Sequence, residues 1–180
     1  MRVITGSARG RKLITLDSDD IRPTSDKVKE AVFSSIQFEI EGRCVLDMFA
    51  GSGALGIEAL SRGAKKTVFC DISKAAVGVI NKNLETTGLK NSATVINGDG
   101  ISYVNVTKEK FDIVFADPPY GKGLCVKALD VISKCMNQGG VIVCETAANE
   151  ELPENAGEFT VSKSVCYGKV KVTYYRVNEL

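Results

Sequence analysis

Short apolar runs alternate with longer amphipathic segments through the middle of this sequence, and this alternation restricts the possible folds more than any other feature. The amphipathic segments have helical periodicity, and several of them are followed by a glycine. A repeating strand–helix order predicts a parallel sheet with helices on both faces. The predicted strands are residues 44–48, 67–70, 93–97, 111–116 and 141–144, and the predicted helices between them are 54–62, 73–86, 100–105 and 123–136.

The two ends of the sequence depart from this alternation. Near the N-terminus, residues 2–5 and 11–15 are short β-like runs around two glycines, which predicts a hairpin followed by one helix. Near the C-terminus, residues 159–167 and 170–177 are two longer β runs joined at a glycine. The second pair predicts an antiparallel hairpin attached to one edge of the parallel sheet.

We therefore expect an α/β fold with a doubly wound, mostly parallel seven-stranded sheet in residues 41–180. Residues 1–40 form the expected extension, a small N-terminal β-hairpin plus a helix. No apolar run is long enough to span a bilayer, and no secretory signal is present. We expect a cytoplasmic protein with no membrane partner.

A glycine-rich turn follows the first predicted strand. Gly51, Gly53 and Gly56 fit the pattern G-x-G-x-x-G, and Asp71 ends the next strand, where an acid that binds ribose hydroxyls belongs. This combination indicates a cofactor that contains a nucleoside. Asp47 stands directly before the turn, where its negative charge repels a phosphate and attracts an ammonium group. The sequence therefore favours a cofactor that carries an amino acid over a dinucleotide.

Asp99 ends the third predicted strand, and two roles are open for it. Its carboxylate can accept an adenine amine, or it can cap the helix that follows. Ligands of open α/β sheets bind outside the carboxyl ends of the strands, so we expect these acids to share one crevice. The predicted cofactor-binding residues are Asp47, Phe49, Ala50, Gly51, Ser52, Gly53, Asp71, Ile72, Asp99 and Gly100.

The motif Asp117-Pro118-Pro119-Tyr120 closes the apolar run at residues 111–116. Proline fixes φ and has no N–H, so the turn is preorganised and displays hydrogen-bond acceptors rather than donors. Acceptors beside an aromatic ring suit a planar group that carries an amine. An ordinary proline turn at a strand end is the alternative. The sequence has no histidine, so a reaction here must use positioning, carboxylates and backbone groups.

Together these motifs resemble the S-adenosylmethionine-dependent methyltransferases, and within them the amino-methylating group that has an Asp/Asn-Pro-Pro-aromatic turn. The resemblance implies a Rossmann-like methyltransferase fold and S-adenosyl-L-methionine as the cofactor. It implies that Asp117 and the Pro118 carbonyl accept the two N–H groups of the target amine, while Tyr120 stacks on the base. The expected catalytic residues are thus Asp117, Pro118, Pro119 and Tyr120.

Longer segments are similar to the RsmD-type 16S ribosomal RNA guanine-N2 methyltransferases. The similarity extends along essentially the whole chain, and its most specific parts are residues 22–33 and 46–64. It implies methylation of N2 of a guanine in 16S rRNA, guanine 966 in bacterial numbering, within the small ribosomal subunit or its assembly intermediate. Asp71 stands where the family more often has Glu, and Tyr120 stands where some members have Phe.

The charge distribution bears on this RNA partner. The chain has 23 basic and 22 acidic residues, yet residues 1–16 and 160–177 each contain basic side chains and no acid. Two basic ends predict one cationic face if the fold joins them, and two solvated edge strands are the alternative. The predicted RNA-binding residues are Arg2, Arg9, Arg11, Lys12, Arg22 and Thr24.

Other functions use part of the same residues. A DNA or another RNA amino-methyltransferase, acting on adenine N6 or cytosine N4, would share the cofactor site, but a DNA enzyme normally needs a further region for base flipping. Protein glutamine N5-methyltransferases typically carry Asn where Asp117 stands. A non-catalytic RNA-binding module would leave Asp47 and Asp117 without a role, and Asp47 also disfavours an NAD-dependent oxidoreductase. Without histidine or a CxxC pair, we expect no metal.

Overall fold

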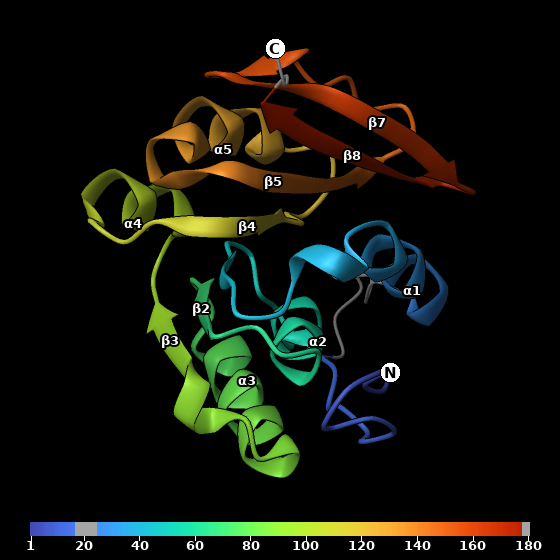
Figure 1. Ribbon diagram of the computed structural model, residues 1–180, viewed down its shortest axis with the longest axis vertical. Coiled ribbons are helices and arrows are strands. Elements are labelled where there is room, and N and C mark those ends of the chain that lie inside the picture. The colour runs from blue at the N-terminus through green and yellow to red at the C-terminus, as the bar shows by residue number, and fades with distance from the viewer. Residues whose placement is uncertain (17–24, 178–180) are drawn as a thin grey trace.

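The computed structural model describes residues 1–16 and 25–177 and contains a mixed eight-stranded sheet with the strand order β3-β2-β1-β4-β5-β8-β7-β6 (Figure 1). The first five strands in the sequence are parallel to one another. Each of the last three strands pairs antiparallel with its neighbours in the sheet. The strands are β1 (Cys44–Asp47), β2 (Lys66–Asp71), β3 (Ala93–Asn97), β4 (Phe111–Ala116), β5 (Met136–Ala147), β6 (Asn155–Ala156), β7 (Phe159–Tyr167) and β8 (Val170–Val177).

Helices cover both faces of this sheet. They are α1 (Asp26–Ser35), α2 (Ala54–Ser61), α3 (Lys74–Thr87), α4 (Gly100–Val106) and α5 (Leu124–Ile132), with short 3-10 helices η1 (Gln37–Glu39), η2 (Lys90–Ser92) and η3 (Ser133–Cys135). Side chains of α1, α2 and α3 pack into one apolar cluster, and those of α4 and α5 pack into a second cluster. Figure 1 shows α5 and α1 on opposite sides of β4 and β5. The doubly wound α/β prediction is therefore confirmed.

The alternation of side chains along the strands explains the two clusters. In β4, Phe115 packs in the cluster of α1, where its ring centroid lies 5.6 Å from that of Phe33, whereas Val114 packs in the cluster of α5. Neighbouring residues of a strand point to opposite faces of a sheet, so a strand buried on both faces is apolar at nearly every position. This is why these strands appear in the sequence as unbroken apolar runs.

The sheet has eight strands, not the seven predicted. The additional strand β6 is two residues long and pairs with the start of β7, so it is too short to produce a pattern in the sequence. Strand β5 is also longer than the predicted residues 141–144. Its extension includes Gly140, where a Cβ atom would lie 2.7 Å from the Asp112 carbonyl oxygen. The close approach of the two backbones explains why a glycine lies inside this strand.

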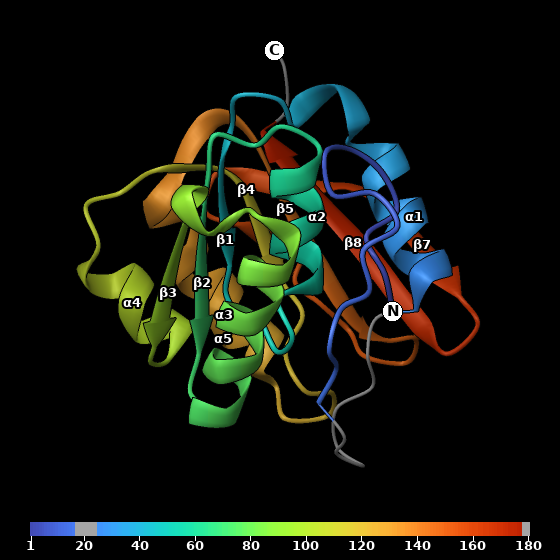
Figure 2. The same ribbon diagram turned by 90° about the horizontal axis from the view of Figure 1, so that it is seen from below.

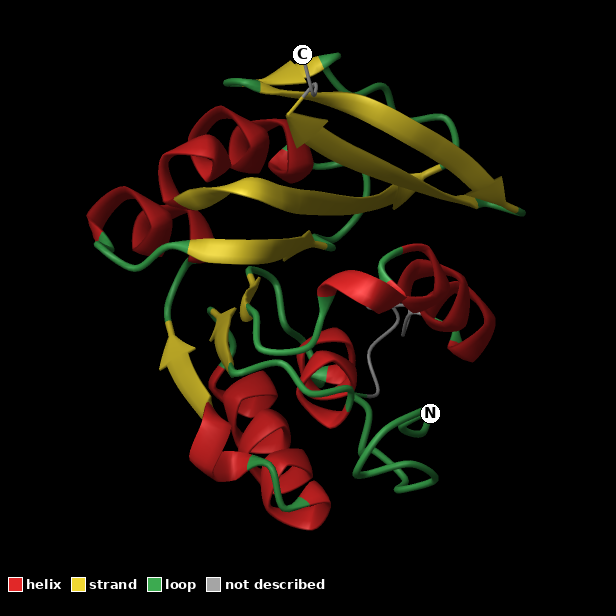
Figure 3. Cartoon of the chain, in the orientation of Figure 1, coloured by secondary structure: helices red, strands yellow, loops and turns green. Residues whose placement is uncertain are grey.

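The predicted N-terminal hairpin forms only in part. Residues 1–16 form a loop with one isolated antiparallel bridge between Arg2 and Lys12, and Figure 3 draws them as loop. The Val3 and Leu13 N–H groups donate across this bridge to the Arg11 and Met1 carbonyls, but the pairing stops there. The next donors bind a side chain of α2: the Ile4 and Thr5 N–H groups donate to Glu58 at 2.9 and 3.0 Å. The N-terminal segment is thus attached to α2.

A buried ionic cluster ties this segment to two helices. Glu58 of α2 lies 3.5 Å from the Lys29 ammonium of α1 and 2.8 Å from Arg62 Nε. Lys29 Nζ also donates to the Arg2 carbonyl at 2.6 Å, and burial lowers the Lys29 pKa although the Glu58 charge raises it. Figure 2 shows the N-terminal segment beside α1 and α2. The role of residues 1–40 as a separate RNA-facing extension stays a prediction.

Candidate functional site

Several acids meet at the edge of the sheet where the parallel strands end. Asp47, the last residue of β1, is paired with Phe69 of β2 and lies, through β4, level with Val143 of β5. Paired residues share a face, and side chains repeat their direction every second residue. Asp71 and Glu145 therefore lie on the same face as Asp47 and one row nearer the edge. This is the face covered by α1 and α2.

Asp47 is the most deeply buried acid of this group, with 1% of its surface exposed. Its Oδ2 accepts the Gly56 N–H of α2 at 3.0 Å, and its Oδ1 is buried with no hydrogen-bond partner among the described residues. Burial raises the pKa of Asp47 to about 7, and the charge of Asp71 also raises it, while the Gly56 N–H lowers it. A buried carboxylate oxygen without a partner is costly, and a cationic donor from a ligand would satisfy it.

The glycine-rich turn joins Asp47 to α2. Gly51 has φ of +55°, and a Cβ atom there would meet nothing within 4 Å, so its outer side is open to a ligand. Gly56 has a different role, because its Cβ would lie 2.3 Å from the Phe69 ring and would separate α2 from β2. Asn83 of α3 holds the turn from behind by donating to the Ser52 carbonyl at 2.9 Å.

Asp71 connects the glycine turn to the end of β2. Its Oδ2 accepts the Gly51 N–H at 2.8 Å and its Oδ1 accepts the Ser73 N–H at 2.9 Å. A carboxylate has about four acceptor positions, so these bonds leave capacity for ribose hydroxyls. Ile72, directly after it, is 76% exposed and provides an apolar surface at the same edge. The pair matches what a nucleoside requires, a polar acceptor beside an apolar plane.

Asp99 has the capping role that the sequence left open. Its Oδ2 accepts the Ser102 N–H at 2.9 Å, which caps α4. Partial burial raises the pKa of Asp99, but the hydrogen bonds from Ser102 and Ile101 outweigh burial and the pKa lies below its ordinary value. Its predicted contact with adenine stays a prediction. At Gly100 a Cβ would lie 2.4 Å from the Met48 carbonyl oxygen, so α4 begins directly against the end of β1.

The motif of residues 117–120 lies at the same edge, directly after β4 and therefore between the ends of β1 and β5. Pro118 is buried, Pro119 is exposed, and Asp117 and Tyr120 are partly buried. The Tyr120 hydroxyl donates to Glu145 Oε1 at 2.7 Å. The predicted catalytic turn thus follows β4, the strand that neighbours β1 and Asp47 in the sheet.

Glu145 is an acid of this edge that the sequence patterns did not predict. Its side chain is 6% exposed and lies near the end of β5, where it receives the Tyr120 hydroxyl. A signal was present, because Glu145 follows the predicted strand 141–144 as directly as Asp71 and Asp117 follow theirs. The rule that strand ends form the site applies equally to this fifth parallel strand.

The predicted RNA-binding residues fall into two groups. Arg22 and Thr24 lie outside the described residues, whereas the other four are exposed on the N-terminal segment; these are Arg2, Arg9, Arg11 and Lys12. That segment ends beside the glycine turn, because Ile14 is bonded through its N–H and carbonyl to Asn83, which also binds the turn. The exposed cations and the glycine turn are therefore connected by one short stretch of chain.

The second basic end of the chain, residues 160–177, contacts helix α1. Lys163 of β7 donates to the Ser35 hydroxyl of α1 at 3.2 Å and lies 5.6 Å from the Tyr174 ring centroid. The N-terminal segment also contacts α1, because Lys29 Nζ donates to the Arg2 carbonyl. Both basic ends are thus in contact with α1, as a single cationic face requires.

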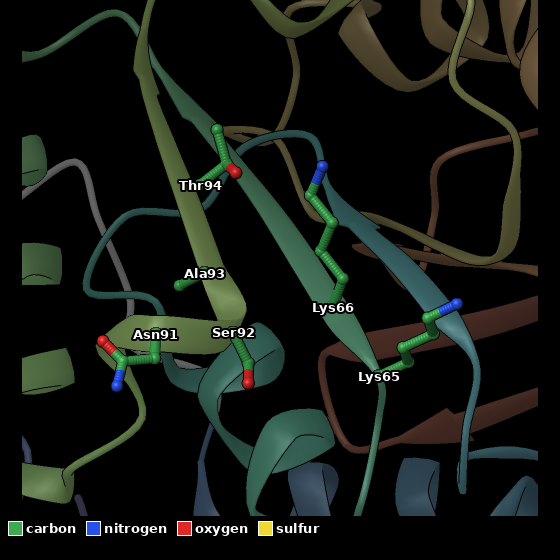
Figure 4. A pocket seen from close by; sticks show the side chains of 6 residues that line it. All are labelled: Lys65, Lys66, Asn91, Ser92, Ala93 and Thr94. Atoms are coloured by element: carbon green, nitrogen blue, oxygen red, sulfur yellow. The ribbon is translucent and has the colours of Figure 1, made fainter.

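A surface hollow lies at the opposite edge of the sheet, where β2 and β3 begin (Figure 4). Its lining residues are Lys65, Lys66, Asn91, Ser92, Ala93 and Thr94. The Lys66 ammonium pairs with Glu109 at 2.7 Å. The hollow is separated from the acids described above by the length of the strands, so it is not part of the candidate site.

Membrane-spanning helices and metal-binding clusters are both absent from residues 1–16 and 25–177. No helix in these ranges is long and apolar enough to cross a membrane. No group of three or more histidine, cysteine, aspartate or glutamate residues in them is arranged to hold a metal ion.

Known proteins resemble the chain in sequence and in structure. A family model described as Conserved hypothetical protein 95 matches residues 1–176. Ribosomal RNA small subunit methyltransferase D of Haemophilus influenzae is 37% identical, over 98% of this chain and 93% of that protein. The protein of the same name from Escherichia coli is 33% identical, over 98% of this chain and 89% of that protein.

Solved structures agree with these sequence matches. The structure of yhhF from Escherichia coli superposes with a TM-score of 0.87 at 32% identity and covers 99% of both chains. A hypothetical protein of Thermus thermophilus superposes with a TM-score of 0.83 at 27% identity, over 98% of this chain and 99% of that one. The similarity therefore includes the N-terminal segment and the C-terminal strands as well as the parallel sheet.

Proposed function

The chain belongs to the Conserved hypothetical protein 95 family, that of the ribosomal RNA small subunit methyltransferase D proteins, and on this basis we propose that it methylates N2 of a guanine in 16S rRNA with S-adenosyl-L-methionine as donor. One observation supports this proposal above the others. The buried Asp47 oxygen without a partner among the described residues lies one strand from the turn of residues 117–120. The acid that would bind the ammonium of the donor is thus adjacent to the turn that would bind the target amine.

The residues at the strand ends fit the donor. Asp47 Oδ1 would accept the ammonium of its methionyl part, and the open side of Gly51 would let the molecule approach the backbone. Asp71 would accept the ribose hydroxyls, and the exposed side chain of Ile72 would cover one face of the adenine. The donor supplies a methyl group that its sulfonium has already activated. The protein then has only to bring the acceptor nitrogen to that methyl group in the correct direction.

The turn of residues 117–120 would hold the acceptor nitrogen. An exocyclic amine on guanine is a weak nucleophile, because its lone pair is delocalised into the ring. Asp117 and the Pro118 carbonyl would accept its two N–H bonds and draw the nitrogen toward tetrahedral geometry. The carboxylate of Asp117 would also stabilise the positive charge that develops as the new C–N bond forms, before the nitrogen loses a proton. Stacking on Tyr120 would add about 1–3 kcal/mol to base binding.

The exposed cations near α1 would bind the RNA backbone. Arg9 and Arg11 lie on the N-terminal segment and Lys163 lies on β7, and both elements contact α1. The proposed partner is 16S rRNA within the small subunit or its assembly intermediate, which would place the enzyme in the cytoplasm. Recognition of an exposed base in folded RNA needs shape and phosphate contacts rather than a large reading domain.

A methyl-incorporation assay tests the proposal. Small subunits from a strain that lacks the orthologous gene would be incubated with the purified protein and labelled S-adenosylmethionine. We expect label in 16S rRNA with the native chain, and a loss of at least about a hundredfold in turnover with Asp117→Ala, because that variant removes an acceptor used in the transition state. The affinity of Asp117→Ala for S-adenosylhomocysteine should stay within about threefold, since Asp117 is not a donor-binding residue. Unchanged turnover in this variant would remove Asp117 from the mechanism.

A further inference from the structure

Glu145 lies in the candidate site without a role in the proposed reaction. It is in β5, which is paired with β4 on one side and with β8 on the other. Only 6% of its surface is exposed, and its Oε1 accepts the Tyr120 hydroxyl at 2.7 Å. A distance of this size is typical of an O–H group that donates to a charged oxygen.

Packing alone does not account for an acid at this position. Burial of a carboxylate is unfavourable unless hydrogen bonds satisfy it, and an apolar side chain would fill the same space without that cost. The four positions of β5 directly before it, residues 141–144, are apolar and buried; Val143, two residues earlier, lies in the core on the same face. The change from apolar side chains to an acid occurs where the strand comes level with the Tyr120 hydroxyl. Glu145 accepts a hydrogen bond from this hydroxyl. The hydrogen bond to Glu145 therefore restricts the position of the Tyr120 ring.

The two ends of the Tyr120 side chain are held in different ways. Pro118 and Pro119 restrict the chain before Tyr120, but they leave rotation about its side-chain bonds free. The hydroxyl at the far end of the ring is held by Glu145, which is paired with Val172 of β8 and directly follows Cys144, the last residue of β5 paired with β4. With both ends held, the ring plane is set before a base arrives, and the loss of rotamer freedom on binding is avoided.

We propose that Glu145 is a positioning residue that fixes the plane of Tyr120 against the target base. This inference rests on the proposed function, because it assigns Glu145 to the stacking step of the same site. Donation from the hydroxyl to a carboxylate also leaves more electron density in the ring. Since the face of an aromatic ring attracts positive charge, the ring would favour the charge that develops on the base as its amine is methylated. Glu145 would then affect the rate of transfer more than the binding of RNA.

A double-mutant cycle tests whether Glu145 acts through Tyr120. The variants are Tyr120→Phe, Glu145→Ala and the double variant, and kcat and KM are measured with deficient small subunits. We expect each single change to lower kcat by about tenfold, the effect of one hydrogen bond to a charged group, with KM for the subunit changed by less than about threefold. The double variant should be no slower than either single variant, because the second change removes an interaction that the first has already abolished.

Glu145→Gln keeps an oxygen that can accept the hydroxyl and preserves the volume, so we expect it to retain more than about a third of the native kcat. It also keeps the test valid if Glu145→Ala fails to fold. The matched control is Tyr103 and Glu109, a tyrosine–glutamate hydrogen bond of 3.2 Å that is exposed and lies outside the site. Tyr103→Phe and Glu109→Ala should leave kcat unchanged.

Losses that multiply in the double variant would overturn the inference, because they would show that Glu145 acts independently of Tyr120. A native kcat in Glu145→Ala would overturn it as well. These outcomes differ from failure of the proposed function, in which the native chain would transfer no methyl group to 16S rRNA. Affinity for S-adenosylhomocysteine, measured on the same proteins, should be equal in all variants, since neither residue is assigned to the donor.

Discussion

Glu58 and Asp47 are both buried acids bonded at α2, and the way their oxygens are satisfied differs. Glu58 is fully buried and accepts the Ile4 and Thr5 N–H groups and Arg62 Nε, with the Lys29 ammonium at 3.5 Å. Asp47 accepts one N–H group, and its second oxygen has no partner among the described residues. The satisfied acid, Glu58, links the N-terminal segment to α1 and α2. The unsatisfied acid has the properties expected of a ligand-binding group.

The largest effect is expected at Glu58. Glu58→Ala would leave the Lys29 ammonium buried beside two backbone N–H groups that no longer have this acceptor. Breaking a buried ion pair in this way typically costs about 3–5 kcal/mol, and the free energy of unfolding should fall by that amount. Chemical denaturation measures it.

The control for Glu58 is an exposed ion pair. Glu85 pairs with Lys90 at 2.8 Å, with more than half of each side chain exposed. Glu85→Ala should change the free energy of unfolding by less than about 1 kcal/mol. Equal losses in Glu85→Ala and Glu58→Ala would contradict the view that the Glu58 cluster anchors the N-terminal segment.

The second effect is on ligand affinity at Asp47. Asp47→Asn should weaken binding of S-adenosylhomocysteine by about tenfold to a hundredfold, because it removes the charge that pairs with the ligand ammonium. The free energy of unfolding without ligand at pH 8 should not fall, since the variant also removes a buried charge. Calorimetric titration measures the affinity, with Asp130→Asn on the exposed side of α5 as the control. Native affinity in Asp47→Asn would remove this acid from the donor site.

The third effect is the contribution of Asp47 to the pH dependence of stability and of ligand affinity. Its pKa is about 7 in the fold, above the ordinary value of 3.8, so the folded state binds a proton more tightly than the unfolded chain. Stability from this proton is complete below pH 4 and is lost as the pH rises to 7. Ligand affinity should change in the opposite direction, falling by up to about tenfold for each pH unit below 7 as the carboxylate is neutralised. Both contributions should be absent in Asp47→Asn, and their persistence there would assign them to other groups.

The smallest effect is expected on RNA binding by the N-terminal segment, which Glu58 attaches to α2. Arg9 and Arg11 are exposed, so Arg9→Glu and Arg11→Glu together should leave the fold intact. RNA binding should weaken, and the slope of log affinity against log salt should decrease by about 1 for each phosphate that the protein no longer neutralises. Lys127→Glu, an exposed change on α5 at the opposite face of the sheet, is the control. An unaltered slope would place the RNA-binding surface elsewhere.

The two buried acids also separate what the sequence could predict from what it could not. The first four parallel strands, the glycine turn and the acids at the strand ends follow local patterns, and the structure has them at or near the predicted positions. Strand β5 is longer than predicted, and β6 was not predicted. The N-terminal hairpin is reduced to one bridge because the N–H groups of residues 4, 5 and 8 bind Glu58 and Ser61, which are more than fifty residues away. The unsatisfied oxygen of Asp47 likewise depends on burial by other elements. The hydrogen bond between Tyr120 and Glu145 could not be predicted, because the two residues are 25 positions apart in the sequence.

The most direct test of the proposed reaction is the identity of the methylated atom. Small subunits that lack the modification would be treated with the native protein and S-adenosylmethionine, and the 16S rRNA would be digested and mapped by mass spectrometry of its fragments and nucleosides. We predict one new methyl group on N2 of a single guanine, absent when Asp117→Ala is used. A methyl group on adenine N6, on cytosine N4 or on a ring nitrogen, or no methyl group at all, would contradict the proposal.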